Sequence, residues 1–409
     1  MKAASFIASK IFSLSREKLS STVMRLSIFS VALGVAVMMV ALAVVVGFKH
    51  EVRNKVIGFV APLQITAINQ NESFEETPFS LDTTLVNLLE SINEVTYYQG
   101  VGNKAGLVKT EDEIQGVVMR GVGSDYDWSY INSNIIEGQV PSFTSNADRS
   151  TDVVISKIIA DKLSLKVGAP LRVWFVDKDM KTRGRRFSIV GVFETGLCEF
   201  DERYVFCDIN QIRKLNGWDD DEIGVVEVWF DKKADIDKVN NQEIYFNLPY
   251  SLTSYTAMQS YPYIFDWLNL LDTNVVIIIA LILIVSGISI ISMLLIIILE
   301  RTSTIGLLKA LGADNSLIRR IFLYRSAKLL LIGLAVGDAF GLLICFLQKQ
   351  FEIISLNPAD YYLSSVPIEL SFGTFALLNI GTIVLWFAML FIPTVLINKI
   401  IPSKSIRFE

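Results

Sequence analysis

The sequence predicts an α-helical membrane protein with four transmembrane helices and a large, mixed α/β domain between helices 1 and 2. The composition is 52% hydrophobic and 19% charged with a mean hydropathy of +0.45, which is too apolar for an ordinary soluble protein. Four long apolar runs are separated by polar connections. The longest connection contains alternating, β-rich runs, and most of the 42 acidic residues of the chain meet water there.

The four apolar runs are long enough to cross a membrane, since a hydrocarbon core of roughly 30 Å takes about 20 helical residues. The first run is not expected to be a cleaved signal peptide, because its only A-x-A match, at residues 41–43, lies inside the run and is followed by more apolar or small residues. It is therefore expected to remain as a helix. The predicted spans are Leu26–Phe48, Val275–Leu299, Leu329–Leu347 and Phe372–Ile397.

Lysine and arginine in the short connections predict the orientation. Residues 1–25 carry five, residues 300–328 carry six and residues 398–409 carry three, whereas residues 348–371 carry one. Both termini and residues 300–328 are therefore expected in the cytoplasm. Residues 348–371 and 49–274 are expected outside, where the longer segment, with 22 basic and 34 acidic residues, forms an acidic domain. A net charge of −5 for the whole chain gives no electrostatic case for binding nucleic acid.

The outer segment is predicted to contain both strands and helices. Asp208 or Asn210 is the expected cap of the last helix. Strands at both ends of the segment indicate two subdomains, one inserted into the other. The predicted strands are Leu63–Ile68, Glu94–Gln99, Gln115–Met119, Leu171–Val176, Phe187–Phe193, Tyr204–Asp208 and Val225–Phe230, and the predicted helices are Leu81–Ile92, Ser156–Leu163 and Asn210–Leu215.

A search for catalytic and metal-binding patterns gives little. The chain has no G-x-x-x-x-G-K-[ST] pattern, so we expect no ATP bound by a P-loop. Its single histidine, His50, is expected to be an interfacial polar residue and not a zinc ligand. Cys198 and Cys207 lie nine residues apart on the oxidising side, where a disulfide and two free thiols both stay open. Cys345 is expected to pack inside the third span.

The third span carries an ionisable residue beside a glycine stripe. An ionised carboxylate in mid-span costs on the order of 3 kcal/mol, so Asp338 is expected to face the protein interior or water, or to be protonated. A structural hydrogen bond and a proton-relay role both stay open. Gly333, Gly337 and Gly341 recur every four residues, which lets another helix approach closely.

The stretch ERTSTIGLLKALGAD, residues 300–314, predicts a short cytoplasmic helix between the second and third spans. Gly312 suits a left-handed stop, and Asp314 can cap the next helix, Ser316–Lys328, which runs into the third span. Two interpretations stay open, a helix lying in the headgroups and a plug for a partner's groove. A broad apolar arc contains Thr304, Ile305, Leu307, Leu308 and Leu311, and a narrow, flat side contains Gly306, Lys309 and Ala310.

From Glu300 to Ala313, the pattern E-R-T…I-G-x-L-K-A-L-G-A resembles the coupling-helix region of ATP-binding-cassette permeases of the MacB/FtsX/LolC-LolE superfamily. FIASKIF and SIFSVALGVAVMMVALAVVVGFKHEVRNKVIGF resemble the first span of lipoprotein-releasing permeases. VISKIIADKLSLKVGAPLRVWF and VGVFETGLCEFDERYVFCDINQIRKLNG resemble parts of their periplasmic domain. YYLSSVPIEL and IPTVLINKIIPSKSIRFE resemble the last outer loop and the terminal span with its tail, so the resemblance covers nearly the whole chain.

This resemblance implies a multi-pass protein of the bacterial inner membrane. An amphipathic cytoplasmic segment (1–25) and the first span (26–48) precede a MacB-like periplasmic core domain (49–274). An FtsX-like permease domain (275–402) follows. It contains spans 275–299, 329–347 and 372–397, the coupling region 300–328 and the outer loop 348–371, and a cytoplasmic tail (398–409) ends the chain.

The function implied by the resemblance is that of a transporter subunit that is not itself an enzyme. Two permease protomers, identical or paralogous, dock on separate LolD-like ATPase subunits, which bind the ATP and magnesium, so this chain needs no cofactor. The complex extracts lipoprotein cargo from the membrane lipid and passes it to a LolA-like periplasmic carrier. The residues implied to couple to the ATPase are Thr304, Ile305, Gly306, Leu307, Leu308, Lys309, Ala310, Leu311 and Gly312.

The resemblance also implies two sites for cargo and carrier. Carrier docking is expected at the basic hairpin 177–186, DKDMKTRGRR, although a solvated turn stays open as an alternative; its residues are Lys178, Met180, Lys181, Arg183 and Arg185. Lipoprotein entry is expected between the first two spans of two protomers. Residues facing bulk lipid or anchoring the helices are the alternative there. The entry residues are Met38, Met39, Leu42, Val46, Phe48, Phe265, Trp267, Leu268 and Leu271.

Three other functions stay open. A MacB-like export permease is less expected, because MacB-type proteins carry a fused ATPase domain before the first span, where this chain has about 25 residues. An FtsX-like signalling subunit is less expected, because its outer domain is much smaller. An intramembrane enzyme that uses Asp338 would lose activity in Asp338→Asn while ATPase coupling stayed intact.

Overall fold

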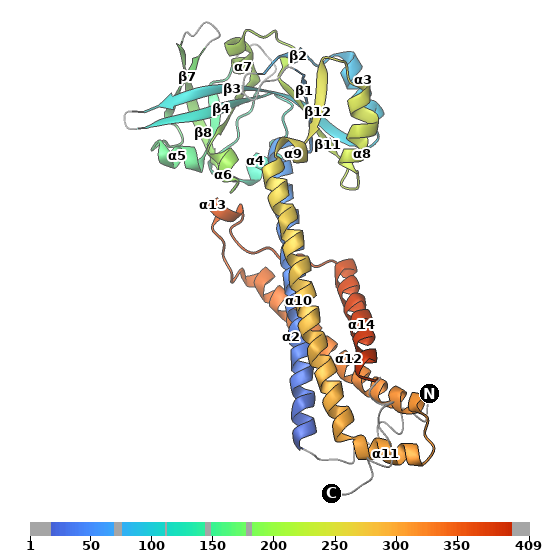
Figure 1. Ribbon diagram of the computed structural model, residues 1–409. Helices are drawn as coiled ribbons and strands as arrows, with labels where there is room; N and C mark the ends of the chain where they lie inside the picture. Colours follow the sequence, from blue (N-terminus) through green and yellow to red (C-terminus); the bar gives the residue numbers. More distant parts are fainter. Residues whose placement is uncertain (1–17, 69–75, 111–112, 144–148, 177–181, 395–409) are drawn as a thin grey trace. The chain divides into compact units, whose positions relative to one another are not determined.

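The computed structural model describes residues 18–68, 76–110, 113–143, 149–176 and 182–394 (Figure 1). These residues belong to two compact units. A helical unit comprises the chain up to Lys49, Leu268–Ser355 and the chain from Ser365 onward. An outer unit comprises His50–Trp267 and also a short segment, Leu356–Ser364, from the loop between the last two spans.

Four helices are long and apolar enough to cross a membrane: α2 (Lys18–Val60), α10 (Pro262–Glu300), α12 (Asn315–Phe351) and α14 (Phe372–Thr394). Two of them extend well beyond the predicted spans. Helix α2 continues past Phe48, because the polar stretch that follows it contains no residue that interrupts a helix before Ala61 and Pro62. Helix α10 begins at Pro262, a residue that suits the first helical position.

Helix α11 (Thr302–Ala310) connects α10 to α12. Gly312 has a φ of +90°, the left-handed conformation expected after a helix end. Asp314 occupies the cap position of α12, although its side chain makes no capping hydrogen bond. The predicted helix 316–328 and the third span are one uninterrupted helix, α12, as the sequence indicated.

The outer unit is built on a mixed sheet of ten of the described strands. Their order is β12-β1-β11-β3-β4-β9-β6-β8-β5, and β7 pairs with β3 and β8. The strands are β1 (Leu63–Ala67), β3 (Val95–Lys109), β4 (Ile114–Val122), β5 (Ile135–Gly138), β6 (Asp152–Ser156), β7 (Pro170–Val176), β8 (Thr182–Phe193), β9 (Tyr204–Asp208), β11 (Val225–Phe230) and β12 (Leu252–Thr256); β2 (Phe79–Ser80) and β10 (Glu222–Ile223) form a separate pair.

The outer unit also contains short helices. Asp208 caps α7, as the sequence allowed, because its carboxylate accepts a hydrogen bond from the Asn210 backbone N–H at 2.9 Å. The helices are α3 (Thr83–Ser91), α4 (Ser129–Ser133), α5 (Lys157–Lys162), α6 (Cys198–Asp201), α7 (Ile209–Asn216), α8 (Ile236–Val239), α9 (Ala257–Ser260) and α13 (Pro358–Tyr361), with a π-helical turn, η1 (Asn240–Ile244), and a 3₁₀ turn, η2 (Tyr245–Asn247). Of these, α3, α5, α7 and α9 contact strands of the sheet.

Strand β3 is far longer than the predicted strand 94–99. It pairs with β11 in its first half and with β4 and β7 in its second half. The part of β3 beyond the predicted strand contains Gly100, Gly102 and Gly106, although glycine is depleted in strands. A Cβ at these positions would come within 2.9 Å of Ile223, 2.9 Å of Trp218 and 2.6 Å of Val173 side-chain atoms, respectively, so each glycine allows a neighbouring side chain to pack on the strand.

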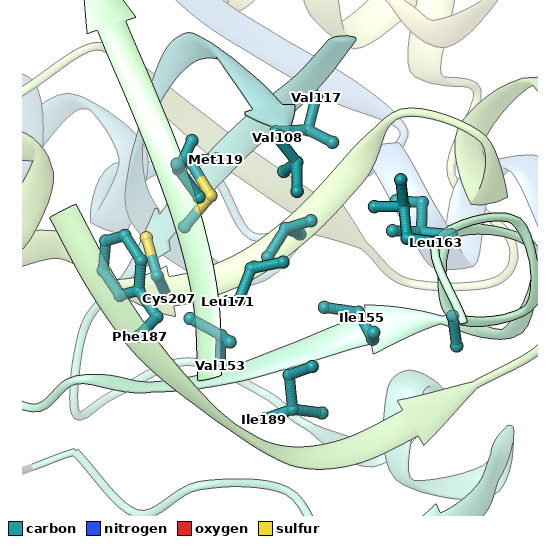
Figure 2. Packing of buried hydrophobic residues seen from close by; sticks show 14 of the residues in the cluster. Val108, Val117, Met119, Val153, Ile155, Leu163, Leu171, Phe187, Ile189 and Cys207 are labelled. Carbon is teal, nitrogen blue, oxygen red and sulfur yellow. The ribbon is translucent and has the colours of Figure 1, made fainter. Parts of the chain in front are cut away.

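Two hydrophobic clusters lie along the sheet. One gathers residues between Val108 and Leu215, and Figure 2 shows part of it, with Cys207 beside Phe187 and Met119. The other gathers residues from the two ends of the outer segment, among them Leu63, Leu85, Val226 and Leu252, together with Ile209. The sheet is continuous across both clusters, because β3 takes part in both halves.

Candidate functional site

Helix α11 presents two different apolar faces. Ile305 is 1% exposed and packs in the helical core with Ile318 and Phe322 of α12, and Leu308 is half-buried against the same core. Leu307 and Leu311 are 55% and 76% exposed. The broad apolar arc expected from the sequence is thus divided between a covered side, with Ile305 and Leu308, and an exposed side, with Leu307 and Leu311. A wheel of one helix does not show which side a neighbouring helix will cover.

The remaining coupling candidates divide in the same way. Gly306 is buried, and Thr304 and Lys309 are half-buried. Ala310 and Gly312 are exposed, as is Ser303, which the sequence did not single out. The outward surface of α11 is thus a stripe of small and apolar groups at helical spacing: Ser303, Leu307, Ala310 and Leu311. Such a stripe can enter an apolar groove of a partner.

The glycine stripe of α12 lies against α2. A Cβ at Gly337 would come within 2.6 Å of the Ala32 backbone oxygen, and one at Gly333 within 2.6 Å of Val31 Cγ1. A Cβ at Gly341 would come within 3.0 Å of Met39 Sδ. The structure therefore brings α12 and α2 together along the whole stripe.

Asp338 lies on α12 beside this stripe and is half-buried. Asn379 of α14 is a hydrogen-bonding neighbour of its carboxyl group. The Oδ1 atom of Asp338 has no hydrogen-bond partner among the described residues. This arrangement is compatible with a structural polar contact between α12 and α14.

The entry residues expected from the sequence do not form an open apolar surface. Met38, Met39, Phe48, Phe265 and Leu268 are buried, and Met38 lies in the helical core. Leu42, Val46, Trp267 and Leu271 are half-buried. The exposed apolar stripe of α2 consists instead of Leu26, Phe29, Leu33 and Val37.

The carrier-docking candidates lie only partly in the described chain. Lys178, Met180 and Lys181 fall outside the described residues. Arg183 is exposed on β8 opposite Phe175, and Arg185 is half-buried opposite Val173.

The cysteines are free thiols, so the disulfide that the sequence left open is absent. Cys207 is buried in the core of the outer unit, whereas Cys198 lies 3.7 Å from the Pro358 carbonyl oxygen. Cys345 is buried on α12, and His50 is exposed on α2. Among the described residues, no group of three or more histidine, cysteine or acidic side chains could hold a metal ion.

Sequence reasoning missed a buried ion pair at the end of α2. The Arg120 guanidinium donates to Glu227, whose other oxygen accepts from Gln99 Nε2 at 2.9 Å. The Cζ atom of Arg120 lies 5.5 Å from the ring centroid of Phe59 on α2 and 5.7 Å from that of Phe206. Burial disfavours its charge, yet the Glu227 carboxylate holds the pKa of Arg120 above its ordinary value. A charge within an apolar strand, as in VVMRGV and VVEVWF, was the available signal.

Lys55 makes a second attachment of α2 within the outer unit. Its Nζ donates to the carbonyl oxygens of Thr195 at 2.7 Å and Tyr362 at 3.0 Å. The Tyr362 hydroxyl donates to Glu199 at 3.4 Å, and its ring lies 6.0 Å from that of Trp267. Burial lowers the pKa of Lys55, although the nearby Glu51 carboxylate opposes this shift. The outer loop 356–364 is thus held to the end of α2.

The fold and the sequence together define the class of protein. Residues 25–242 match the family described as MacB-like periplasmic core domain, and residues 276–402 match the FtsX-like permease C-terminal family. The chain belongs to the MacB-like periplasmic core domain family and is an ABC transporter permease of the MacB/FtsX/LolC superfamily, an inner-membrane protein with a periplasmic domain.

Its similarity to lipoprotein-releasing permeases extends over almost the whole chain. It is 23% identical to the lipoprotein-releasing system transmembrane protein LolC of Neisseria meningitidis serogroup B, covering 96% of each chain. It is 21% identical to LolC of Xylella fastidiosa, covering 94% of this chain and 93% of that protein. The periplasmic region of MacB from Actinobacillus actinomycetemcomitans matches 51% of this chain and 95% of that chain, at 10% identity and a TM-score of 0.35.

Proposed function

We propose that this chain is the permease subunit of an ATP-driven complex that extracts lipoproteins from the inner membrane and passes them to a periplasmic carrier. The observation that carries the proposal is the similarity, over 87% to 97% of the chain, to proteins named as LolC or LolE of the lipoprotein-releasing system. In the proposed complex, separate ATPase subunits bind the ATP and magnesium. A second permease protomer, a copy or a paralogue, completes the pathway for the cargo.

Helix α11 is the proposed contact with the ATPase. Its exposed stripe suits insertion into an apolar groove, and its inner face fixes it to α12 through Ile305 and Leu308. A short helix anchored in this way transmits movement, because it cannot rotate without disturbing the core beneath it. This proposal requires both chain termini on the cytoplasmic side.

Cargo is proposed to enter between α2 and α10 of the two protomers. Because the methionines named from the sequence are buried, the apolar surface that α2 offers to a second protomer or to acyl chains is the exposed stripe with Leu33 and Val37. The carrier is proposed to dock at the basic hairpin 177–186, of which Arg183 and Arg185 lie in the described chain.

The coupling role of α11 is tested by substituting its two faces separately. We expect Leu307→Glu and Leu311→Glu to abolish ATP-dependent release with little change in thermal stability, since a charge would be buried unpaired in the partner's groove. Leu308→Glu is the matched control and should mainly lower thermal stability, because Leu308 packs on the helical core. Wild-type release by both exposed-face variants would exclude this role.

The function itself is tested in proteoliposomes. The chain is purified with its co-purifying ATPase, whose identity is established by mass spectrometry, and reconstituted with a triacylated lipoprotein and an excess of soluble periplasmic carrier. We expect lipoprotein to appear in the soluble fraction only with hydrolysable ATP. Vigorous ATP hydrolysis without release, in the presence of carrier, would refute lipoprotein release and favour an export or signalling role.

A further inference from the structure

The outer unit contains a hollow of about 470 Å³ that the functions above do not use. It lies where β3, β4 and β7 meet. Leu107 of β3 pairs with Gly116 of β4 on one side and with Trp174 of β7 on the other, and Ala105 pairs with Val118. Residues paired across strands share a face of the sheet, so the hollow lies on one face, away from the Val108 and Val173 side chains of the core.

Two glycines produce this hollow. A Cβ at Gly116 would meet no atom within 4 Å, so the absent side chain leaves the space beside Leu107 empty. Gly184 of β8 lies under the Trp174 ring, because a Cβ there would come within 3.0 to 3.3 Å of three ring atoms. The indole therefore lies across β8 and forms a wall. The hollow is set by the sequence of the strands.

The walls are apolar and the polar groups lie at one end. Leu107, Trp174 and Val176 line the hollow and are 43% to 46% exposed, and together they form an exposed apolar patch of the kind that marks a binding site. Glu202, Arg203 and Gln115 supply the polar end. The Gln115 amide is held there by the carbonyl oxygens of Gly116 and Glu202, each at 3.0 Å.

We propose that this hollow, the acyl slot, holds one fatty-acyl chain whose ester or amide carbonyl oxygen accepts a hydrogen bond from Arg203. An apolar hollow with a single polar end fits a linear chain with a polar head, and its volume lies within the roughly 300–1,000 Å³ of small-ligand sites. Val176 is also the last described residue before the hairpin proposed to dock the carrier, so the slot adjoins the proposed place of hand-over. The adjacency to the carrier hairpin is the part of this inference that rests on the proposed function.

The test uses the full chain in lipid nanodiscs and two photoreactive probes. One is a phospholipid with a diazirine in its acyl chain, and the other is a synthetic triacylated lipopeptide with the same diazirine. After illumination, adducts are mapped by mass spectrometry. We expect adducts on the strands that contain Leu107 and Trp174. Labelling by the lipopeptide alone would identify cargo as the source of the chain, whereas labelling by both probes would identify membrane lipid as a further source.

Two variants should prevent acyl binding by different means. Gly116→Leu fills it, and we expect at least a fivefold loss of adducts. Leu107→Asn makes a wall polar without adding bulk, and should give a similar loss if Gly116→Leu folds poorly. Arg172→Leu is the matched control, because it adds a leucine two residues from Trp174 but outside the slot.

Absence of wild-type adducts on these strands, or equal labelling of wild type and both slot variants, would overturn the proposal. Phospholipid labelling needs neither cargo nor carrier. The acyl slot and lipoprotein release can therefore fail independently, and the proteoliposome assay described above reports the second.

Discussion

Helix α2 packs by different means in its two halves. In the half that crosses the membrane, it approaches α12 so closely that glycines are needed at Gly333, Gly337 and Gly341. Near its outer end, Phe59 packs among aromatic rings, with centroids 4.8 Å from Phe200 and 5.7 Å from Phe206, over a buried arginine.

The difference follows from the two solvents. Lipid gives no hydrophobic driving force between helices, so small residues and close van der Waals contact hold α2 and α12 together. Water does give that force, so the outer attachment uses large aromatic side chains and can also contain a desolvated ion pair. The two halves should therefore respond to different perturbations.

The largest effect is expected at Arg120. Arg120→Leu leaves Glu227 buried without its partner, and breaking such a pair costs about 3–5 kcal/mol. Thermal unfolding of the full chain in detergent, followed by tryptophan fluorescence, should show a large loss of stability. The double variant Arg120→Leu with Glu227→Leu should recover most of it. A single variant as stable as the wild type would mean that the ion pair does not hold the outer attachment.

A smaller effect is expected at Gly337. Gly337→Leu forces α2 and α12 apart, since its Cβ would meet the Ala32 backbone, and overpacking of this kind costs about 1–3 kcal/mol. Gly381→Leu on α14 is the control, because a Cβ there meets no atom within 4 Å. The same unfolding measurement applies. Equal stability of the two variants would place the stripe against lipid.

An effect of pH, which spreads gradually over about two pH units, is expected only in the outer unit. Burial raises the pKa of Asp201 to about 6, although hydrogen bonds from Thr195 and Gly196 oppose the shift. Its pKa in the unfolded chain is about 3.9. The folded state therefore binds the proton more tightly, and Asp201 stabilises the fold below about pH 4. That contribution is lost as the pH rises towards 6.

A difference of about two pKa units corresponds to a loss of roughly 2–3 kcal/mol. Unfolding profiles of the wild type and Asp201→Asn between pH 4 and 7 measure it, because the asparagine variant lacks the titration. Parallel profiles for the two proteins would show that Asp201 does not titrate in this range.

The sequence predicted best what depends on composition and alternation. The spans follow from runs of apolar residues, and the predicted strands 204–208 and 225–230 match β9 and β11 at both ends. Both are short, buried runs rich in β-branched and aromatic residues, where local preference and tertiary environment agree.

Features that depend on neighbours were not predictable. The predicted strand stopped at residue 99, because the sequence alone does not show that Ile223, Trp218 and Val173 pack on the glycines that follow. Only the position of α12 decides which leucines of α11 are covered. In the sequence Arg120 is a single charge within an apolar strand, and its partner, Glu227, lies 107 residues away in the chain.

The loop segment Leu356–Ser364 has a practical consequence for anyone who wishes to study the periplasmic part alone. The outer unit is assembled from two separate pieces of chain, so a continuous fragment that contains both pieces also contains helices α11 and α12. A fragment cut at residues 49 and 274 would lack Tyr362, and Lys55 would lose one of the two carbonyl oxygens that it bonds. A faithful soluble version would need residues 356–364 grafted back through a linker.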